Sequence, residues 1–292
     1  MPEDAPDKWA EFIEYNRQDV VVEKAIRKRL LSLKPPAIEH EYWLLDQDIN
    51  WRGVKVDMDL VDAALQCNDE IVEKATASSE RLTGLDNPNS TLQLKDWISN
   101  RLGYEVETMR KDDVSNLLSQ DIPSDVRTVL KNRQVLGNSS IKKYLAMKNA
   151  VCSDGRIHGM LQFYGAMRSG RWAGRVVQLQ NLPRNYLEDL DTARDVLKSR
   201  DVELLDLLYG NPGDVIKQLI RTALVAEEGH RFIVADFSAI EARVIAWLAH
   251  EQWRQDVFAQ GGDIYCASAS SMFHVPVAVS YTHLTLPTNR EV

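Results

Sequence analysis

The sequence contains few cysteines, and their arrangement does not suggest a covalent or metal-bound scaffold. The three that are present, Cys67, Cys152 and Cys266, lie far apart and form no Cys-x-x-Cys pair. This excludes the small disulfide-stabilised domains and the thiolate zinc sites, whose cysteines recur at short spacings. We expect three ordinary reduced thiols.

Long hydrophobic runs and a surplus of positive charge are also missing. No apolar stretch approaches the ~18 residues that a membrane span needs, and the first residues, Met-Pro-Glu-Asp-Ala-Pro, are not those of a signal peptide. We therefore expect a soluble, intracellular protein without a membrane partner. The net charge of -8 argues against a protein that coats nucleic acid, so a nucleic-acid site would have to be local.

The composition is otherwise that of a globular chain. Its 292 residues are 44% hydrophobic and 27% charged, which is enough for a sizeable core and for more than one domain. Apolar residues recur at helical spacing over much of residues 8–150, and strand-like composition begins near residue 155. The pattern predicts a mostly helical α+β protein.

The most informative stretch runs from Arg231 to Ala249. The apolar run at 232–235 has the composition of a strand buried on both faces, and it ends at Asp236. Beyond it the spacing becomes helical, and Glu241 follows one and a half turns later. At ~1.5 Å rise per residue the two acids would lie about 7 Å apart along the axis, which suits a ligand of nucleotide size. From the residues alone, an ordinary strand-to-helix turn with a surface acid is the alternative.

The octapeptide Asp236-Phe-Ser-Ala-Ile-Glu-Ala-Arg243 closely resembles the first catalytic motif of family A DNA polymerases, whose usual form is Asp-Tyr-Ser-Gln-Ile-Glu-Leu-Arg. The resemblance implies that Asp236 binds both catalytic Mg²⁺ ions, together with the backbone carbonyl of Phe237. It also implies that Glu241 belongs to the steric gate against ribonucleotides. Asp236 and Glu241 are therefore the expected catalytic residues.

A basic segment at residues 166–185 is the second feature of functional interest. It contains four arginines and no acid, a local charge of +4, interleaved with amide side chains. Such a surface suits phosphates and base edges, although an arginine-rich loop that pairs with acids elsewhere would have the same composition. Within it, Ser169-Gly-Arg171 followed by Leu179-Gln-Asn-Leu-Pro183 resembles the Thr-Gly-Arg…Leu-Gln-Asn-Ile-Pro element of the same family.

By that resemblance, the basic segment touches the minor groove of the primer-template near the growing end. Minor-groove acceptors are nearly the same for every base pair, so such contacts test the geometry of a pair without reading sequence. Trp172, Ala173 and Gly174 depart from the family's usual Leu-Ser-Ser, so the contacts of those serines are not transferred. The DNA-binding residues implied are Arg171, Arg175, Gln178, Gln180 and Asn181.

Two further segments resemble parts of these enzymes. Gly262-Asp-Ile-Tyr265 resembles an Asp-Ile-His segment whose His touches the phosphates of the incoming nucleotide, so Tyr265 is the corresponding nucleotide-binding candidate. In the helix expected over residues 8–33, Tyr15 and Asp19 lie four residues apart and hence on one face. From the spacing alone, a solvated helix face is the better explanation of that pair. It also resembles the third motif of 3′-5′ proofreading exonucleases, in which the Asp is a metal ligand and the Tyr positions the attacking water.

The predicted fold is α+β and mostly helical, a partial right-hand polymerase preceded by the terminal helix of a ribonuclease H-like 3′-5′ exonuclease domain. Lys142 and Lys143 are candidates for phosphate contacts, although a solvated helix face explains them equally well. The predicted divisions are residues 1–35 for the end of the exonuclease domain, 36–150 for connecting and thumb helices, 151–278 for the first half of the palm, and 279–292 for an adapter-like, non-native tail.

The function implied is template-directed nucleotidyl transfer by a phage-type, replicative family A DNA polymerase. Its partners would be primer-template DNA and deoxynucleoside triphosphates, its cofactor two Mg²⁺ ions, and we expect a monomer in the cytoplasm of a bacterial host. The first two exonuclease motifs and the second and third palm motifs have no counterpart here, so we expect a fragment truncated at both ends that does not polymerise alone. Two alternatives stay open: a non-catalytic DNA-binding module, and a single-subunit RNA polymerase-like palm, against which Glu241 argues.

Overall fold

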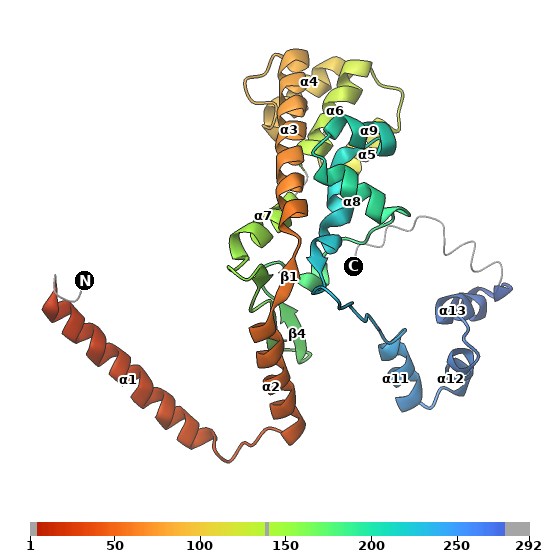
Figure 1. Ribbon diagram of the computed structural model, residues 1–292. Helices are drawn as coiled ribbons and strands as arrows, with labels where there is room; N and C mark the ends of the chain where they lie inside the picture. The colour runs from red at the N-terminus through yellow and green to blue at the C-terminus, as the bar shows by residue number, and fades with distance from the viewer. Residues whose placement is uncertain (1–4, 138–139, 278–292) are drawn as a thin grey trace. The chain divides into compact units, whose positions relative to one another are not determined.

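The computed structural model describes residues 5–137 and 140–277, which form two units (Figure 1). The first unit runs up to Arg231 and contains most of the helices and all of the strands that are described. The second begins at Phe232 and contains three α-helices within its described part. None of the described helices is long and apolar enough to cross a membrane.

The first helix, α1 (Pro6–Leu30), buries none of its side chains. Proline at its first position suits a helix start, because proline has no N–H to leave unpaired there and its φ is already helical. The apolar residues that give the segment its helical spacing stay exposed, among them Trp9 at 44% and Phe12 at 54%. The helix ends before Pro35 and Pro36, since proline cannot continue the hydrogen-bond ladder.

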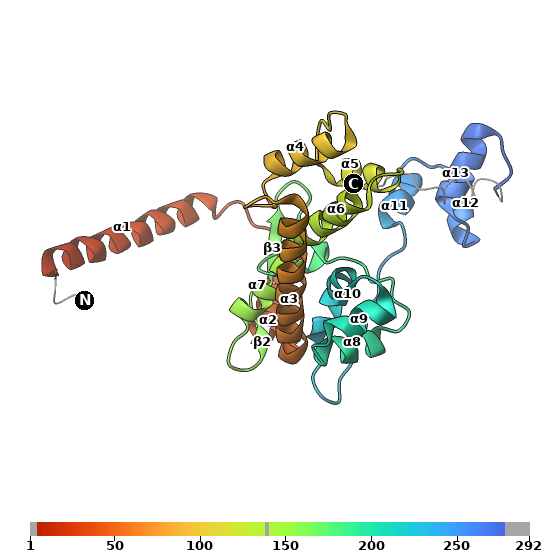
Figure 2. The same ribbon diagram turned by 90° about the horizontal axis from the view of Figure 1, so that it is seen from above.

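The first unit is organised around α3 (Met58–Thr83), which Figures 1 and 2 show as its longest inner helix. Asp57 caps its N-terminus, accepting a 3.1 Å hydrogen bond from the backbone N–H of Leu60, and Gly84 ends it in a left-handed conformation. Its buried side chains recur every three or four residues, so one stripe faces the interior. Against it pack α6 (Ser124–Leu136), α7 (Ile141–Ala150), α8 (Leu190–Lys198), α9 (Val202–Tyr209) and α10 (Pro212–Gln218).

Two hydrophobic cores support this arrangement. The larger one joins the N-terminal half of α3 to α7, α8, α9 and α10, and it contains the fully buried Leu60, Tyr144 and Leu205. The smaller one is formed by α4 (Thr91–Leu102), α5 (Lys111–Leu118) and α6 around Leu94 and Leu130. Ser90 caps α4, with its Oγ accepting from the N–H of Gln93 at 3.5 Å, and α6 and α7 are separate helices.

Strands are short and few in the described chain. A three-stranded antiparallel sheet has the order β2-β1-β5, formed by β2 (Arg156–Ile157), β1 (Val54–Val56) and β5 (Leu224–Val225). A separate hairpin pairs β3 (Leu161–Ala166) with β4 (Arg171–Gly174). Helix α2 (Ala37–Arg52) packs against β3, and the single turns η1 (Leu179–Asn181) and η2 (Leu219–Ala223) follow the hairpin and α10.

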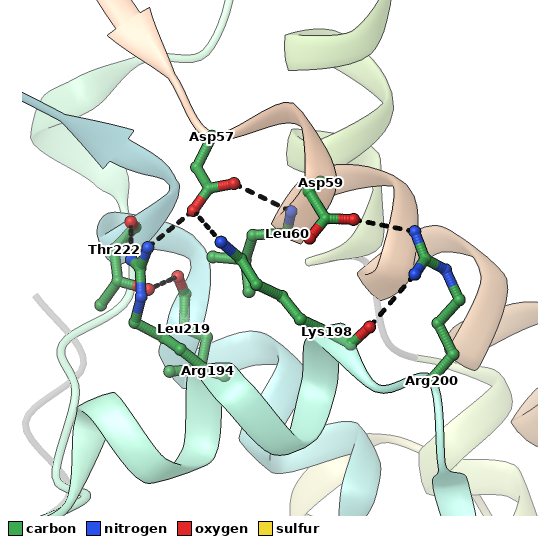
Figure 3. Close-up of polar contacts among 8 residues, drawn as sticks. All are labelled: Asp57, Asp59, Leu60, Arg194, Lys198, Arg200, Leu219 and Thr222. Atoms are coloured by element: carbon green, nitrogen blue, oxygen red, sulfur yellow. Dashed lines mark hydrogen bonds and ion pairs between the residues drawn. The ribbon is translucent and has the colours of Figure 1, made fainter.

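Polar contacts tie the start of α3 to α8 (Figure 3). The carboxylate of Asp57 lies 2.7 Å from the guanidinium of Arg194 and 2.6 Å from Nζ of Lys198. Only 13% of the Asp57 side chain is exposed. Beside it, Asp59 accepts from Arg200 at 3.0 Å. The sheet is held in the same region, because Arg194 also donates to the carbonyl of Thr222 ahead of β5.

The second unit contradicts one expectation. Residues 232–235, predicted to form a strand buried on both faces, are extended but unpaired in the described chain, and Phe232, Ile233 and Val234 are 55, 85 and 91% exposed. A strand buried on both faces needs neighbours on its edges and layers on its faces. The described strands β1, β2 and β5 pair with one another instead, so the apolar composition alone was a misleading guide.

The helix predicted after this segment is present as α11 (Ile240–Leu248), followed by α12 (Gln252–Ala259) and α13 (Ile264–Phe273). Of the residues of α11, all of them described, only Ala246 is buried. Phe258, Ile264 and Cys266 are buried with it within this unit. The cysteines are free, as expected, and the adapter-like residues 279–292 lie outside the described residues.

Candidate functional site

The basic segment begins in the β3–β4 hairpin. The N–H groups of Ser169 and Gly170 both donate to the carbonyl of Ala166, at 3.0 and 2.9 Å, and close the turn. Gly170 has φ +68°, and a Cβ there would lie 2.9 Å from the ring of Tyr164, so glycine is required on both counts. The turn brings Arg171 to the first position of β4, opposite Ala166, where it is exposed.

The hairpin is docked on α2 by two sets of hydrogen bonds. The indole Nε1 of Trp172 donates to the carboxylate of Asp46 at 2.9 Å. One turn later, Asn50 bonds both backbone groups of Leu161: its Nδ2 donates to the carbonyl at 2.9 Å, and its Oδ1 accepts from the N–H at 3.0 Å. The hairpin is therefore held to the helix at both of its strands.

The amide-rich residues after the hairpin are flanked in sequence by two buried apolar residues. Val177 is fully buried and Leu182 is 5% exposed, while Gln178, Gln180 and Asn181 between them are exposed. Gln178 adopts a left-handed conformation with φ 55°, which turns the chain into η1, and its Oε1 accepts from the Nδ2 of Asn181 at 3.3 Å. The segment thus presents three amide side chains within four residues.

Cations on neighbouring elements hold the backbone of this segment. Lys143 Nζ donates to the carbonyl of Val177 at 2.8 Å, and Arg221 donates to the carbonyls of Leu182 and Pro183, each at 2.8 Å. Lys143, one of two lysines predicted to be candidates for phosphate contacts, therefore has a positioning contact within the fold. Lys142 is exposed.

The predicted DNA-binding residues all lie on one stretch of the chain, within the first unit. Arg175 follows β4 directly and its Nε donates to Oε1 of Gln162 on β3, at 3.0 Å. Arg175, Gln178, Gln180, Asn181 and the further arginines at 168, 171 and 184 are all exposed. The result is an exposed surface of guanidinium and amide groups, which we call the arginine–amide surface, without an acidic residue in 166–185.

Asp236 lies in the second unit, on the extended stretch that precedes α11, and its side chain is exposed. Phe237 beside it is 78% exposed. Ala239, the residue before α11, adopts φ 50° and ψ 40°, a left-handed conformation that costs a residue with a Cβ some strain. Glu241 follows in the first turn of α11 and is also exposed.

Arg243 braces this turn from within the same unit. Its Nε donates to the carbonyl of Ser238 at 2.8 Å, and its guanidinium lies over the ring of Phe258 on α12, 4.3 Å from the centroid. The stretch after Asp236 is therefore tied to two helices. A stacked guanidinium of this kind contributes ~0.5–1 kcal/mol at an exposed site.

Tyr265 is placed at the start of α13 with 58% of its surface exposed. Asp263 caps that helix, accepting from the N–H groups of Tyr265 at 2.7 Å and Cys266 at 3.1 Å.

The described residues contain no group of three or more His, Cys, Asp or Glu side chains that could hold a metal ion. Asp236 and Phe237 thus lack, within this part of the chain, the companion carboxylates that a metal centre requires. The same holds for Asp19 on α1, which lies one turn from Tyr15, a residue 66% exposed. The donor set that is described does not fit a complete metal centre.

The residues that sequence reasoning missed lie on α2. Asp46 and Asn50 anchor the hairpin, and Tyr42 meets Trp172 edge-on with ring centroids 6.0 Å apart. The three are spaced four residues apart and so share one face of the helix. That stripe was the available signal, but its partner lies more than a hundred residues further along the chain.

Comparison with known proteins agrees with the motifs. The family model described as DNA polymerase family A matches residues 60–283. The DNA polymerase of Bacillus phage SP02 is 51% identical over 277 residues, which cover 95% of this chain and 43% of the phage protein. The thermostable DNA polymerase I of Thermus aquaticus is 40% identical over 85 residues, 29% of this chain and 10% of that protein.

Among solved structures, the chain resembles one described as the POL domain of Pol1 from M. smegmatis in complex with DNA primer-template and dNTP. The TM-score is 0.51 at 22% identity, and the match covers 78% of this chain and 36% of that one. At this identity the likeness concerns the fold. The chain spans less than half the length of the phage relative that it matches.

Proposed function

The chain belongs to DNA polymerase family A, and from that membership we propose that it is the part of a template-directed DNA polymerase that holds the primer-template and contributes one catalytic carboxylate. The observation that supports the proposal most directly is the arginine–amide surface. This surface concentrates positive charge and hydrogen-bonding amides within residues 166–185 of a chain whose net charge is -8.

The arginine–amide surface has the chemistry that a minor groove requires. Guanidinium groups such as that of Arg171 donate to the acceptors that every base pair offers there, and the amides of Gln178 and Asn181 can both donate and accept. Because these acceptors hardly vary with sequence, the contacts favour a correctly paired primer end over any particular base. A copying enzyme needs that property. The surface would therefore seat the primer end, with Arg175 and Gln180 beside it.

For the second unit we propose the roles that the octapeptide implies. Family A DNA polymerases generally use Mg²⁺, and such ions supply charge stabilisation for the attacking and leaving oxygens. Asp236, with the carbonyl of Phe237, would be one ligand, Glu241 would crowd a 2′-hydroxyl, and Tyr265 would meet the phosphates of a deoxynucleoside triphosphate. Because the described donor set does not fit a complete metal centre, we assign no step to a bound ion.

The remaining assignments are part of the same proposal. We propose residues 1–35 as the end of a 3′-5′ exonuclease domain with Tyr15 and Asp19 on its helix, residues 36–150 as connecting and thumb helices, and residues 151–278 as the first half of the palm. The protein would act as a monomer in the cytoplasm of a bacterial host of the phage. The 51% identity to a phage polymerase supports this setting.

Binding of a fluorescently labelled primer-template by the purified chain tests the proposed DNA surface. We expect Arg171→Ala to weaken binding about tenfold, equivalent to about 1.4 kcal/mol. Arg200→Ala is the matched control, because it removes the same charge from a surface arginine that bonds Asp59 at 3.0 Å. Equal losses in both variants would mean that only overall charge matters, and the proposed surface would be wrong.

A non-catalytic DNA-binding module is the second candidate, and Asp236 separates the two. In a chimera whose remaining sequence comes from the phage SP02 polymerase, Asp236→Ala should abolish primer extension and leave duplex binding nearly intact. Unchanged extension would remove the catalytic role and favour the module. Extension with ribonucleotides in preference to deoxyribonucleotides would point instead to an RNA polymerase.

A further inference from the structure

Helix α2 carries a buried carboxylate that the proposed chemistry does not use. Of the residues of α2, all of which are described, only Asp46 is buried, at 4% exposure, while apolar neighbours such as Trp43 and Leu45 stay 44 and 47% exposed. Packing of α2 against the rest of the fold thus places a charged group, rather than an apolar one, at its most enclosed position. Burying a carboxylate is costly unless its oxygens are hydrogen-bonded.

The hydrogen bonds to Asp46 lead to the hairpin. Its Oδ1 accepts from Nε1 of Trp172 at 2.9 Å, and its Oδ2 accepts from Nε2 of Gln47 at 3.2 Å. The indole is enclosed by two aromatic rings that meet it edge-on, Tyr42 of α2 at 6.0 Å and Phe163 of β3 at 5.4 Å between centroids. The orientation of the indole is therefore set by a directional hydrogen bond and by contact with two aromatic rings.

Because β4 is pleated, the orientation of Trp172 also sets the direction of its neighbour Arg171, a member of the arginine–amide surface. Successive side chains of a strand point to opposite faces, so fixing Trp172 toward α2 directs Arg171 away from it. A slip of one residue would exchange the two. Register matters here because the pairing of β3 with β4 is irregular between Gln162 and Ala166, and because the ladder is only a few residues long.

We propose that Asp46 and Trp172 are a positioning pair that sets the face and register of the hairpin, and through them the direction in which Arg171 meets duplex DNA. This inference rests on the proposed function, because it assumes that Arg171 contacts DNA. Asp46 itself does not touch the ligand. Its negative charge would oppose phosphates if it were exposed, and its burial beneath the indole keeps it away from the DNA-facing side.

The test is a set of variants of the full 292-residue chain whose binding to a labelled primer-template duplex is measured by fluorescence anisotropy. Trp172→Phe keeps an aromatic ring and removes the donor, and Asp46→Ala removes the acceptor. Each variant should weaken DNA binding about three- to tenfold. The double variant should lose no more affinity than the more affected single variant, because both substitutions remove the same hydrogen bond. Asp46→Asn keeps an acceptor for the indole and should bind within about twofold of the wild type.

A second arm separates positioning from general support of the fold. In the Arg171→Ala background, Asp46→Ala should cause no further loss, because its effect passes through Arg171. A purely structural effect would weaken binding by the same factor in both backgrounds, and that result would overturn the inference. Unchanged binding in Trp172→Phe would also overturn the inference. Circular dichroism verifies that this variant is folded.

The failure of the proposed function is a different result. If Arg171→Ala itself leaves binding unchanged, the arginine–amide surface is not the DNA site, whatever the Asp46 and Trp172 variants do. If Arg171→Ala weakens binding while Asp46→Ala and Trp172→Phe do not, the proposed function stands and the positioning pair is wrong.

Discussion

The carboxylate of Asp57, at the N-terminus of α3, accepts a 2.7 Å hydrogen bond from the guanidinium of Arg194 on α8 (Figure 3). This contact joins α3 to α8, and Asp57 also caps α3 through the N–H of Leu60 and follows directly on β1. Lys198 lies 2.6 Å from the same oxygen. Asp57 therefore caps α3, binds α8 and directly follows the sheet strand β1.

Removal of Asp57 should be strongly destabilising. We expect Asp57→Ala to lower the free energy of unfolding by roughly 3 kcal/mol, because it leaves two partly buried cations without their partner and removes a helix cap. Urea denaturation followed by circular dichroism measures the change. Asp59→Ala is the control: its pair with Arg200 is exposed, at 57 and 37% of the two side chains, so its loss should stay below about 1 kcal/mol. Equal losses would contradict the assignment.

The same group should make stability depend on pH. Burial by itself would raise the pKa of Asp57, but the hydrogen bonds from Lys198 and the N–H of Leu60, together with the charges of Lys198 and Arg194, hold it below its ordinary value of 3.8. The stabilisation is therefore complete above the pKa of the unfolded chain and is lost as the pH falls through the lower folded pKa. The difference in unfolding free energy between wild type and Asp57→Asn should stay constant from pH 7 to about 5 and shrink below about 4. A difference that grew on acidification would have the wrong sign.

Gly174, at the end of β4, should not tolerate a side chain. A Cβ there would clash with the side chain of Gln180 and lie 2.9 Å from the backbone Cα of Gln178, which cannot move without shifting the amide segment. We expect Gly174→Ala to cost about 1–3 kcal/mol of stability and to weaken binding of primer-template DNA. Gly213→Ala is the control, since its Cβ would meet nothing nearer than Asn211 Oδ1 at 3.6 Å. Unimpaired DNA binding by Gly174→Ala would show that the amide geometry is not needed.

Tyr144 provides a test of the core itself. It is fully buried on α7, and its hydroxyl donates to the carbonyl of Ile216 on α10 at 2.7 Å. Tyr144→Phe leaves that carbonyl without its partner, so we expect a loss of about 1–2 kcal/mol in thermal or urea denaturation. Tyr104→Phe, which removes an exposed hydroxyl 3.4 Å from Gln120, should change stability by less than about 0.5 kcal/mol. A negligible effect at Tyr144 would mean that α10 is not held there.

Elements with local signals were predicted well. The region predicted to be helical, over much of residues 8–150, contains the helices α1 to α7, since caps, glycines and apolar spacing act within a few residues of one another. The members of the arginine–amide surface are neighbours along the chain and are exposed, and their contact with DNA stays a prediction. The strand at 232–235 was predicted wrongly, because a strand is stabilised by partners that its own composition cannot specify.

The sequence by itself determined the family, the arginines and amides of residues 166–185, and the two carboxylates of the octapeptide. A motif of eight residues and a spaced pair of short elements were sufficient, because catalytic chemistry constrains residue identity locally. Only the tertiary structure decided what holds those residues in place. Asp46 and Trp172 are 126 positions apart, and their hydrogen bond exists because the chain folds the hairpin onto α2, a contact between segments that no local pattern encodes.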